Sequence, residues 1–463
     1  MKLLIIFAIW VVLTGCQRQH LEIFPPLSST DMMDKKIDPK LLHQDIDFLI
    51  EGARLRHPDL FKYANEKQLT SYVEQIKSQI SEPLTRLEFY RHIGQLNHRF
   101  NDGHSMLLWP YPEYARLEST EQQPFPFKIA LEPNGKVLLK HHYENDEGEV
   151  LAAGSEVTHI NGKGIKHLLA QLQRYVGGET AYLRQQFIVG RFPLFLWAVT
   201  DMLDEFELGL QVDGKSVVKM VRVNQNWQVI KNEKTTEESF YYRQVNKDTG
   251  FLYVGHFDIE PSKFEDFVDG SFATINSQNI KNLIIDVRDN TGGNTDTVTY
   301  LARHLANKPF RLISRLTEKL NPDNRGLFNY KGEVGDMLTS AWEEWEEPVT
   351  EESRFKGKTF LLISPITYSA GIVFATTLKD NHFAILIGQE TGGFANQTAQ
   401  GNLFNLPHSE LRAYITTRLL VRPSGDTEIT GVKPHYQTAV SKQSLRQSRD
   451  VEVEKALELI ADK

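Results

Sequence analysis

The stretch FLLISPITYSAGIVFATTLKDN, residues 360–381, changes from an apolar run to a helical pattern within a few residues. The run that ends at Ile363 has the length and composition of a buried strand, and the residues from Ala370 onward have the apolar spacing of a helix. A short turn containing Pro365 joins the two segments and places Ser369 immediately before the helix. A strand followed directly by a helix is the repeating unit of a parallel α/β sheet.

The same alternation extends through the second half of the chain. Strands are expected at 250–257, 281–288, 358–364 and 383–388, and helices at 294–306 and 370–380. Short apolar strands that alternate with helices predict a mainly parallel sheet with crossover helices. Active sites of such sheets lie at the carboxyl ends of the strands, where the turns 290–294 (NTGGN) and 364–371 (SPITYSAG) are both expected.

Length and composition predict a globular protein of several domains. With 463 residues, the chain is too long for one ordinary core, and two or three domains are expected. Hydrophobic residues make up 40% of the chain and charged residues 24%, which is typical of globular proteins. The net charge of −8 does not favour nucleic acid or an acidic membrane surface as a partner.

The first residues, MKLLIIFAIWVVLTGC, have the features of a secretion signal. The apolar run from Leu3 to Leu13 is too short to span a bilayer and fits a signal-peptide core. The ending LTGC resembles the lipobox of bacterial lipoproteins, which predicts a lipoprotein signal peptide over 1–16 and acyl chains on Cys16. The alternative is an ordinary signal peptide. With Gln17 next, we expect a lipid-anchored protein of the bacterial cell envelope, at the outer membrane and facing the periplasm.

Composition and pattern divide the rest of the chain. Cys16 is the only cysteine, so the mature chain has no disulfide and no thiolate metal site. A Pro pair and a Ser/Thr/Asp cluster predict a tether over 17–37. Beyond it we expect a helical region at 38–121, a β-rich module at 122–225, an α/β core at 240–440 and a C-terminal helix at 441–463.

Two interpretations of Ser369 follow from its position. It is either the N-cap of the helix, a common role for serine, or a nucleophile beside the positive end of the helix dipole. The N–H of Ala370, together with one from Gly292 or Gly293, would form an oxyanion hole for that nucleophile. The alternative for the glycine pair is a tight strand-to-helix turn. The G-x-S-x-G motif of the α/β-hydrolases is absent around Ser369.

A serine nucleophile needs a base, and His104 is the candidate among 15 histidines. A capping box in which Thr85 pairs with Glu88 starts a helix, and the loop NDGHS that follows it carries His104. Gly103 in this loop suits a positive φ. The histidine pair at 141–142 has no partner at metal-ligand spacing, so no metal and no cofactor are expected.

Four segments, in this order and spacing, resemble the C-terminal processing (tail-specific) peptidases, a superfamily that includes the tricorn protease core. They are LIIDVRDNTGGN (283–294), SPITYSAGIVFATTLKDN (364–381), AILIGQETGG (384–393) and SGDTEITGVKPH (424–435). The resemblance covers about 240–440, with a weaker PDZ-like match over 122–225. It implies a spiral of ββα units like that of the ClpP and crotonase enzymes.

The resemblance also implies a particular set of catalytic residues. Members of the Ser/Lys type carry a lysine about 25 residues after the serine, where this chain has Phe394. The tricorn-like branch uses Ser, His and Glu instead, which implies Ser369 as nucleophile, His104 as base and Glu428 as the acid that orients the imidazole. That branch has a serine before the histidine, where this chain has Gly103.

The resulting expectation is a serine endopeptidase that cuts envelope proteins or peptides through an acyl-enzyme. Its PDZ-like module would pair with substrate by strand addition. One alternative is a non-catalytic lipoprotein that binds peptides or hydrophobic ligands on the same fold, and another is a structural envelope lipoprotein.

Overall fold

The computed structural model describes residues 25–120, 122–132, 134–212, 214–230, 239–325 and 332–462. The predicted signal peptide, its Cys16 and the first part of the tether lie outside these residues. Within the described part of the chain, none of the helices has the length and apolar character needed to cross a membrane.

A six-stranded sheet forms the core of the C-terminal half, and its strand order is β11-β12-β13-β16-β17-β20. All neighbours are parallel except β11 and β12, which confirms the predicted α/β class. The strands are β11 (Phe240–Asn246), β12 (Thr249–Val254), β13 (Asn282–Asp286), β16 (Lys358–Ile363), β17 (Ile385–Gly388) and β20 (Tyr436–Gln437).

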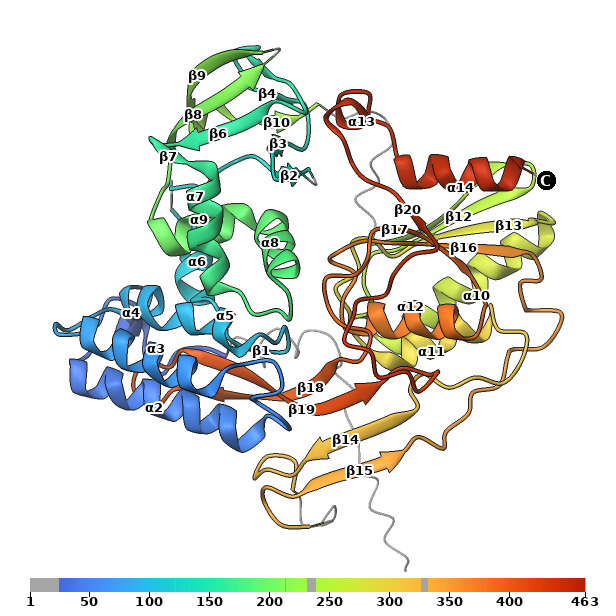
Figure 1. Ribbon diagram of the computed structural model, residues 1–463. Helices are drawn as coiled ribbons and strands as arrows, with labels where there is room; N and C mark the ends of the chain where they lie inside the picture. Colours follow the sequence, from blue (N-terminus) through green and yellow to red (C-terminus); the bar gives the residue numbers. More distant parts are fainter. Residues whose placement is uncertain are drawn as a thin grey trace, which may run out of the picture.

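Helices cover both faces of this sheet (Figure 1). Leu283 and Ile285 of β13 face one way, into a core shared with three helices, whereas Ile284 faces the other way, toward the C-terminal helix. Because both faces are buried, β13 is a continuous apolar run rather than an alternating one. The helices are α10 (Pro261–Ser277), α11 (Thr295–Arg303) and α12 (Ala370–Asp380) on the first face, α14 (Val451–Ala461) on the second, and α13 (Lys442–Arg446) just before α14.

A second sheet, which the sequence analysis did not predict, links the two halves of the chain. Its long strand β19 (Arg412–Val421) pairs with β18 (Thr398–Asn405) along one edge. Along the other edge it pairs with β1 (Ser105–Leu107) and then with β14 (Arg315–Lys319), which also pairs with β15 (Met337–Ala341). Figure 1 shows β18 and β19 running from the parallel sheet to the N-terminal helices.

The N-terminal region is helical, as expected. The side chain of Thr85 accepts a hydrogen bond from the Glu88 N–H, and the Glu88 carboxylate accepts one from the Thr85 N–H at 2.7 Å, so the predicted capping box is present. Asn101, in the left-handed region at φ 50°, ends the last helix before the loop of His104. The helices are η1 (Thr30–Met33), α2 (Pro39–Arg56), α3 (Glu66–Gln79), α4 (Arg86–Ile93), η2 (Gly94–Leu96), α5 (Asn97–Phe100) and α6 (Tyr111–Glu118).

The module at 122–225 contains more helix than its strand-like patterns indicate. Its sheet comprises β2 (Ile129–Leu131), β3 (Val137–Leu139), β6 (Glu156–Ile160), β7 (Lys163–Gly164), β8 (Glu205–Val212) and β9 (Lys215–Arg222). A small sheet adds β4 (Tyr143–Glu144), β5 (Val150–Leu151) and β10 (Gln228–Val229), and the helices are α7 (Ile165–Leu172), η3 (Gln173–Tyr175), α8 (Ala181–Gly190) and α9 (Phe192–Thr200), with η4 (Val223–Gln225) after β9. One continuous core joins this module to the N-terminal helices and to β19.

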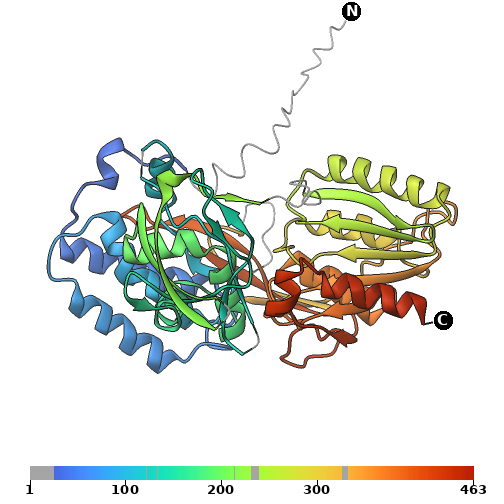
Figure 2. The same ribbon diagram turned by 90° about the horizontal axis from the view of Figure 1, so that it is seen from above.

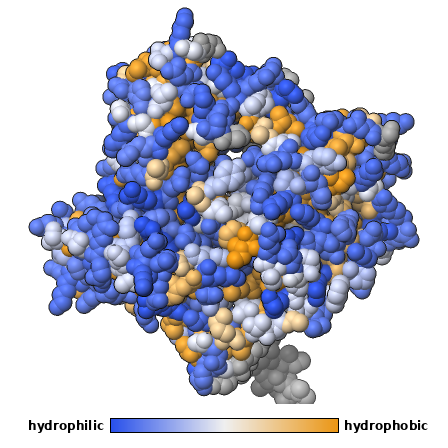
Figure 3. Space-filling view, in the orientation of Figure 1, coloured by the Kyte–Doolittle hydropathy of each residue, from blue (hydrophilic) through white to orange (hydrophobic). Residues whose placement is uncertain are grey.

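The molecule therefore has two lobes (Figure 2). One consists of the N-terminal helices and the module, and the other of the parallel sheet and its helices. The face seen in Figure 3 is mostly hydrophilic, with apolar side chains gathered near its middle.

Arg288 fastens the C-terminal helix to the parallel sheet. Its guanidinium contacts Asp286 at the end of β13 at 2.6 Å, and Asp450 and Glu452 at the start of α14 at 2.7 and 2.9 Å. Asp286 and Glu452 are almost fully buried. Arg288 thus pairs with three carboxylates, and its removal takes a positive charge away from buried negative charge.

We predict that Arg288→Met lowers the free energy of unfolding by about 3 kcal/mol, the scale for breaking a buried ion pair. Urea unfolding followed by circular dichroism measures this change. The control is Arg449→Met, which removes an exposed pair with Glu454 and is expected to change stability little. Equal effects of the two substitutions would contradict the anchoring role of Arg288.

Candidate active site

Ser369 lies at the N-cap position of α12 in a conformation that non-glycine residues rarely adopt. Its φ of 52° and ψ of −121° are strained for an L-residue. Within the described part of the chain, its side chain makes no capping hydrogen bond. The helix-cap interpretation of Ser369 is therefore wrong in this structure, and the hydroxyl is left available for other chemistry.

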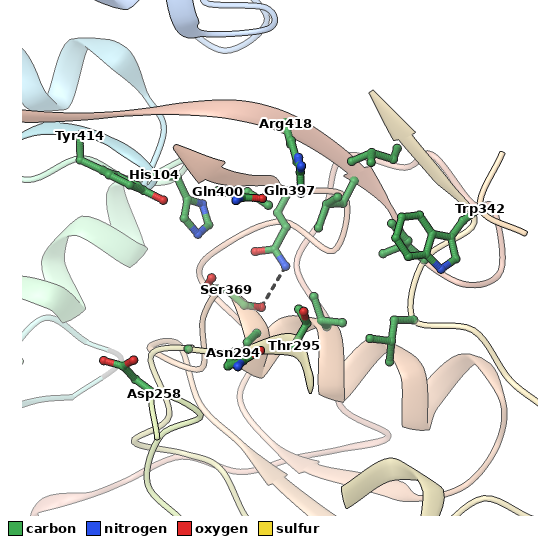
Figure 4. Close-up of a pocket in the computed structure, with 18 residues that line it drawn as sticks. His104, Asp258, Asn294, Thr295, Trp342, Ser369, Gln397, Gln400, Tyr414 and Arg418 are labelled. Carbon is green, nitrogen blue, oxygen red and sulfur yellow. Dashed lines mark hydrogen bonds between the residues drawn. The ribbon is translucent and has the colours of Figure 1, made fainter. Parts of the chain in front are cut away.

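A pocket of about 580 Å³ brings Ser369 and His104 together (Figure 4). The start of α12 and the turn around Gly293 form its floor, and the beginning of β18 lies above them. One wall is apolar and extends to Trp342. That wall consists of Leu312, Ile313, Leu316, Trp342, Val373 and Leu420.

Gly292, the first glycine of the pair, packs directly against Ser369. A Cβ on Gly292, whose φ is 116°, would lie 2.6 Å from the Ser369 Cβ. The Gly292 N–H is already donated to Asn290 Oδ1 at 2.9 Å, so in this conformation Gly292 permits the close contact but is not a free donor. Gly293 and Ala370 line the pocket, and their N–H groups are the candidate oxyanion donors.

His104 is buried beside this pocket, with 8% of its surface exposed. The strand β1 begins at the next residue, and its pairing with β19 fixes the loop. The ring stacks on Tyr368, with centroids 4.8 Å apart, and Nδ1 lies 3.1 Å from both the Tyr368 hydroxyl and Thr398 Oγ1. Nε2 is buried and has no hydrogen-bond partner among the residues that the structure describes.

Asp102, two residues before His104, is completely buried and accepts four hydrogen bonds. Oδ1 accepts from the His104 main-chain N–H at 2.9 Å and from Thr398 Oγ1 at 2.6 Å. Oδ2 accepts from Ser105 Oγ at 2.7 Å and pairs with His57 Nε2 at 3.0 Å. Burial opposes ionisation of Asp102, but His57 and the other partners outweigh it and hold the pKa well below its usual range.

A second carboxyl group, Glu179, lies on the other side of His104. It accepts a hydrogen bond from the Tyr368 hydroxyl at 2.7 Å, while its Oε2 is buried and unpartnered in the described part of the chain. Burial and the nearby charge of Asp102 raise the pKa of Glu179 to about 8. Gly103 makes this arrangement possible, because a Cβ there would lie 2.2 Å from the Tyr368 hydroxyl oxygen. A serine at that position would not fit.

Two adjacent residues, the last before β18 and the first of β18, contact both reacting residues. Gln397 donates a hydrogen bond from Nε2 to the Ser369 carbonyl oxygen at 2.9 Å (Figure 4). The next residue, Thr398, contacts the His104 imidazole. The backbone of β18 therefore sets where the serine and the histidine lie relative to each other.

The structure does not bring Glu428 to His104. The Glu428 side chain is 63% exposed, lies 4.0 Å from Lys433 and lines a different, highly charged pocket with Lys379. Phe394 stands where members of the Ser/Lys branch have their lysine. Its ring packs against that of Tyr63, with the two ring centroids 5.4 Å apart. Motif resemblance placed Glu428 in the site, but a motif in an exposed turn does not determine where its side chain points.

The acidic and hydroxyl groups that do surround His104 were not identified from the sequence. Asp102 belongs to the NDGHS motif that also contains His104, so the sequence offered a signal for it. Glu179, Thr398 and Gln397 lie in no comparable local motif. Glu179 comes from a different segment than the adjacent Gln397 and Thr398, and the two segments meet around His104 and Tyr368 only in the folded structure.

Three of these groups also satisfy a simple proximity test for a metal site. Asp102, His104 and Glu179 each offer one ligand atom within 4.8 Å of the others. However, both Asp102 oxygens and His104 Nδ1 are already hydrogen-bonded. That leaves His104 Nε2 and one oxygen of Glu179, fewer than the three or four protein ligands of zinc sites.

The proteins that this chain resembles have folds similar to the one described above. Residues 248–438 match the model of peptidase family S41. No curated protein matches the chain significantly. A crystal structure of a CPAF mutant is 15% identical with a TM-score of 0.70 and covers 92% of this chain and 98% of its own. Mature CPAF in complex with lactacystin is also 15% identical, with a TM-score of 0.68 over 91% of this chain and 97% of its own.

A protein from Parabacteroides merdae that is proposed to be a peptidase is 12% identical, with a TM-score of 0.50 over 92% of this chain and 98% of its own. At such low identities these likenesses concern the fold.

We predict that Glu179→Gln changes how stability depends on pH. The folded-state pKa of Glu179 is raised from 4.5 to about 8, so its contribution to stability is full below pH 4.5 and is lost as the pH rises to about 8. Glutamine resembles the protonated form at every pH. The melting temperature of Glu179→Gln minus that of the wild type should therefore increase from pH 5 to pH 8 and then level off.

Glu344→Gln, at an exposed position, is the control for this experiment, and its difference from the wild type should stay constant over the same range. Parallel curves for Glu179→Gln and wild type would contradict the raised pKa.

Proposed function

We infer that the protein is a serine peptidase with Ser369 as nucleophile and His104 as general base, because residues 248–438 match the model of peptidase family S41. One observation carries the assignment. Among the residues that the structure describes, a serine with a positive φ and no side-chain capping bond lines the same pocket as a buried histidine with an unpartnered ring nitrogen. Strained residues cluster at functional sites, and a base needs a free lone pair.

The proposed reaction uses the groups of this pocket in two steps. His104 Nε2 takes the hydroxyl proton as Ser369 Oγ bonds to the peptide carbonyl carbon, and the carbonyl electron pair moves onto its oxygen. The N–H groups of Gly293 and Ala370 stabilise that oxyanion. The imidazolium then gives its proton to the amine nitrogen as the C–N bond breaks, which leaves an acyl ester on Ser369. Water, activated in the same way, releases the acid.

The pocket also favours a class of substrate. Its apolar wall, which includes Leu316, Trp342 and Leu420, suits a peptide with a large apolar side chain near the scissile bond. We propose envelope proteins or peptides as substrates, since the lipobox-like LTGC before Cys16 favours a lipid-anchored, periplasm-facing enzyme. The PDZ-like module would present the substrate strand.

We predict that a fluorophosphonate probe labels the wild type and that Ser369→Ala abolishes labelling. Hydrolysis of apolar peptides should fall by about 10³-fold or more, the scale for loss of a catalytic nucleophile. Mass spectrometry of the labelled peptide locates the adduct. Ser262→Ala, on the surface at the start of α10, is the control and should label normally. A folded wild type that the probe does not label would favour the non-catalytic ligand-binding interpretation.

We further predict that Gly292→Ala lowers kcat for peptide hydrolysis by about 100-fold, because a displacement of about 1 Å at the nucleophile has this scale of effect. The new methyl group would lie 2.6 Å from the Ser369 Cβ. Gly335→Ala is a matched control, since Gly335 also has a positive φ, of 98°, but a Cβ there would lie within 4 Å of none of the described residues. Equal kcat losses in the two variants would mean that backbone strain, not contact with Ser369, causes the effect.

A further inference from the structure

We propose that Asp102 orients His104 through the hydroxyl of Thr398, so that Thr398 is a positioning residue of the active site. This inference rests on the proposed roles of Ser369 and His104. In this proposal Asp102, which is separated from the imidazole by one hydroxyl group, has the orienting role that the motif resemblance implied for Glu428.

The directions of the hydrogen bonds follow from the state of Asp102. Its two oxygens face four donors, and one of them, His57, is fixed in its tautomer: His57 Nδ1 accepts from the Asp59 N–H at 3.0 Å, so the ring proton lies on Nε2 and points to Asp102. A protonated carboxyl group could not accept from all four partners. Asp102 is therefore a carboxylate and has no proton to donate to Thr398.

This leaves one arrangement for the Thr398 hydroxyl. Its single proton points to Asp102 Oδ1, 2.6 Å away, so toward His104 the oxygen can only accept. The His104 nitrogen 3.1 Å from it, Nδ1, must then carry the ring proton. The lone pair of the neutral imidazole consequently lies on Nε2, the atom beside the pocket that has no partner among the described residues. This is the tautomer that a general base requires.

Tyr368 supports the same tautomer from the other side. Its hydroxyl donates to Glu179 at 2.7 Å and lies 3.1 Å from His104 Nδ1, so it too faces the ring as an acceptor. Tyr368 contacts Glu179, a carboxyl group whose pKa is raised to about 8, whereas Thr398 contacts Asp102, which is a carboxylate at every physiological pH. The orientation through Thr398 therefore does not change with physiological pH.

The chain of hydrogen bonds from Asp102 through Thr398 to His104, which we call the relay, also has an electrostatic effect. When His104 accepts the Ser369 proton, it becomes a cation in a buried site, where an isolated charge is strongly unfavourable. Asp102 supplies a negative charge on the far side of a single hydroxyl group. Burial lowers the pKa of His104, and the charge of Asp102 opposes that shift. Asp102 thus stabilises the imidazolium as well as setting the tautomer.

Four variants test the relay through the rate of fluorophosphonate labelling. We expect Asp102→Asn and Thr398→Val to lower the rate by about 10–100-fold, the usual scale for a residue that orients a reacting group through another. Thr398→Ser keeps the hydroxyl and should label within about threefold of the wild type. Glu428→Gln tests the competing assignment and should label like the wild type.

The pH profile of labelling separates orientation from general damage to the fold. Groups that titrate or carry charge near the imidazole are Asp102 on its own loop, Glu179 before α8, Tyr368 before α12, and Tyr414, Arg418 and Asp258 around the pocket. Asp102→Asn removes the charge that raises the His104 pKa, so the acid limb of the profile should move to lower pH. Thr398→Val keeps that charge, so its limb should stay near that of the wild type.

A spectroscopic readout makes the test independent of activity. In protein labelled with ¹⁵N-histidine, with His104→Gln used for assignment, the wild type should show His104 protonated at Nδ1, and Thr398→Val should show a mixture of tautomers. The proposal is overturned if the wild type is protonated at Nε2, if Thr398→Val labels like the wild type, or if Glu428→Gln slows labelling as much as Asp102→Asn. A wild type with the expected tautomer that does not label would instead refute the peptidase function and leave the relay supported.

Discussion

The pairing of β19 with three other strands is the constraint on which the active site depends. On one edge β19 pairs with β1, which follows the loop of His104, and on the other it pairs with β18, which begins at Thr398 directly after Gln397. These contacts join residues that are far apart in the chain, such as Ser105 of β1 and Ile415 of β19. The parallel sheet supplies Ser369, but only the second sheet places a base above it.

Around this base, nearly every buried polar atom is paired, and the exceptions are informative. A buried group without a partner is unfavourable, so each one needs a reason. Near the site, the unpartnered atoms in the described part of the chain are His104 Nε2, Glu179 Oε2 and Gln397 Oε1. His104 Nε2 carries the lone pair that proton transfer requires. Full satisfaction of Asp102, in contrast, makes the other side of the imidazole rigid, because its acceptor positions are filled by groups from the loop, from α2's C-terminal end and from β18.

Sequence reasoning predicted the parts of this molecule that depend on local pattern. Strands such as β13 are apolar on both faces and are easily identified, and Ser369 and His104 lie in turns whose composition marks them. The β18–β19 pair was missed because its half-exposed residues give no clear periodicity. Glu428 was expected from a motif, yet its carboxylate points to Lys433. Thr398 and Glu179 have no signal of their own, because their roles arise from contacts between distant segments.

The Thr398 hydroxyl between His104 and Asp102 affects the pKa of the imidazole. A carboxylate in direct contact would raise the imidazole pKa strongly, whereas here burial dominates and the pKa of His104 is lowered despite Asp102. A less basic imidazole accepts the serine proton less readily but remains neutral, and so competent, in more acidic solution. The weaker base then depends more on geometry. Gln397 and Thr398 supply that geometry, since these consecutive residues contact the nucleophile residue and the base.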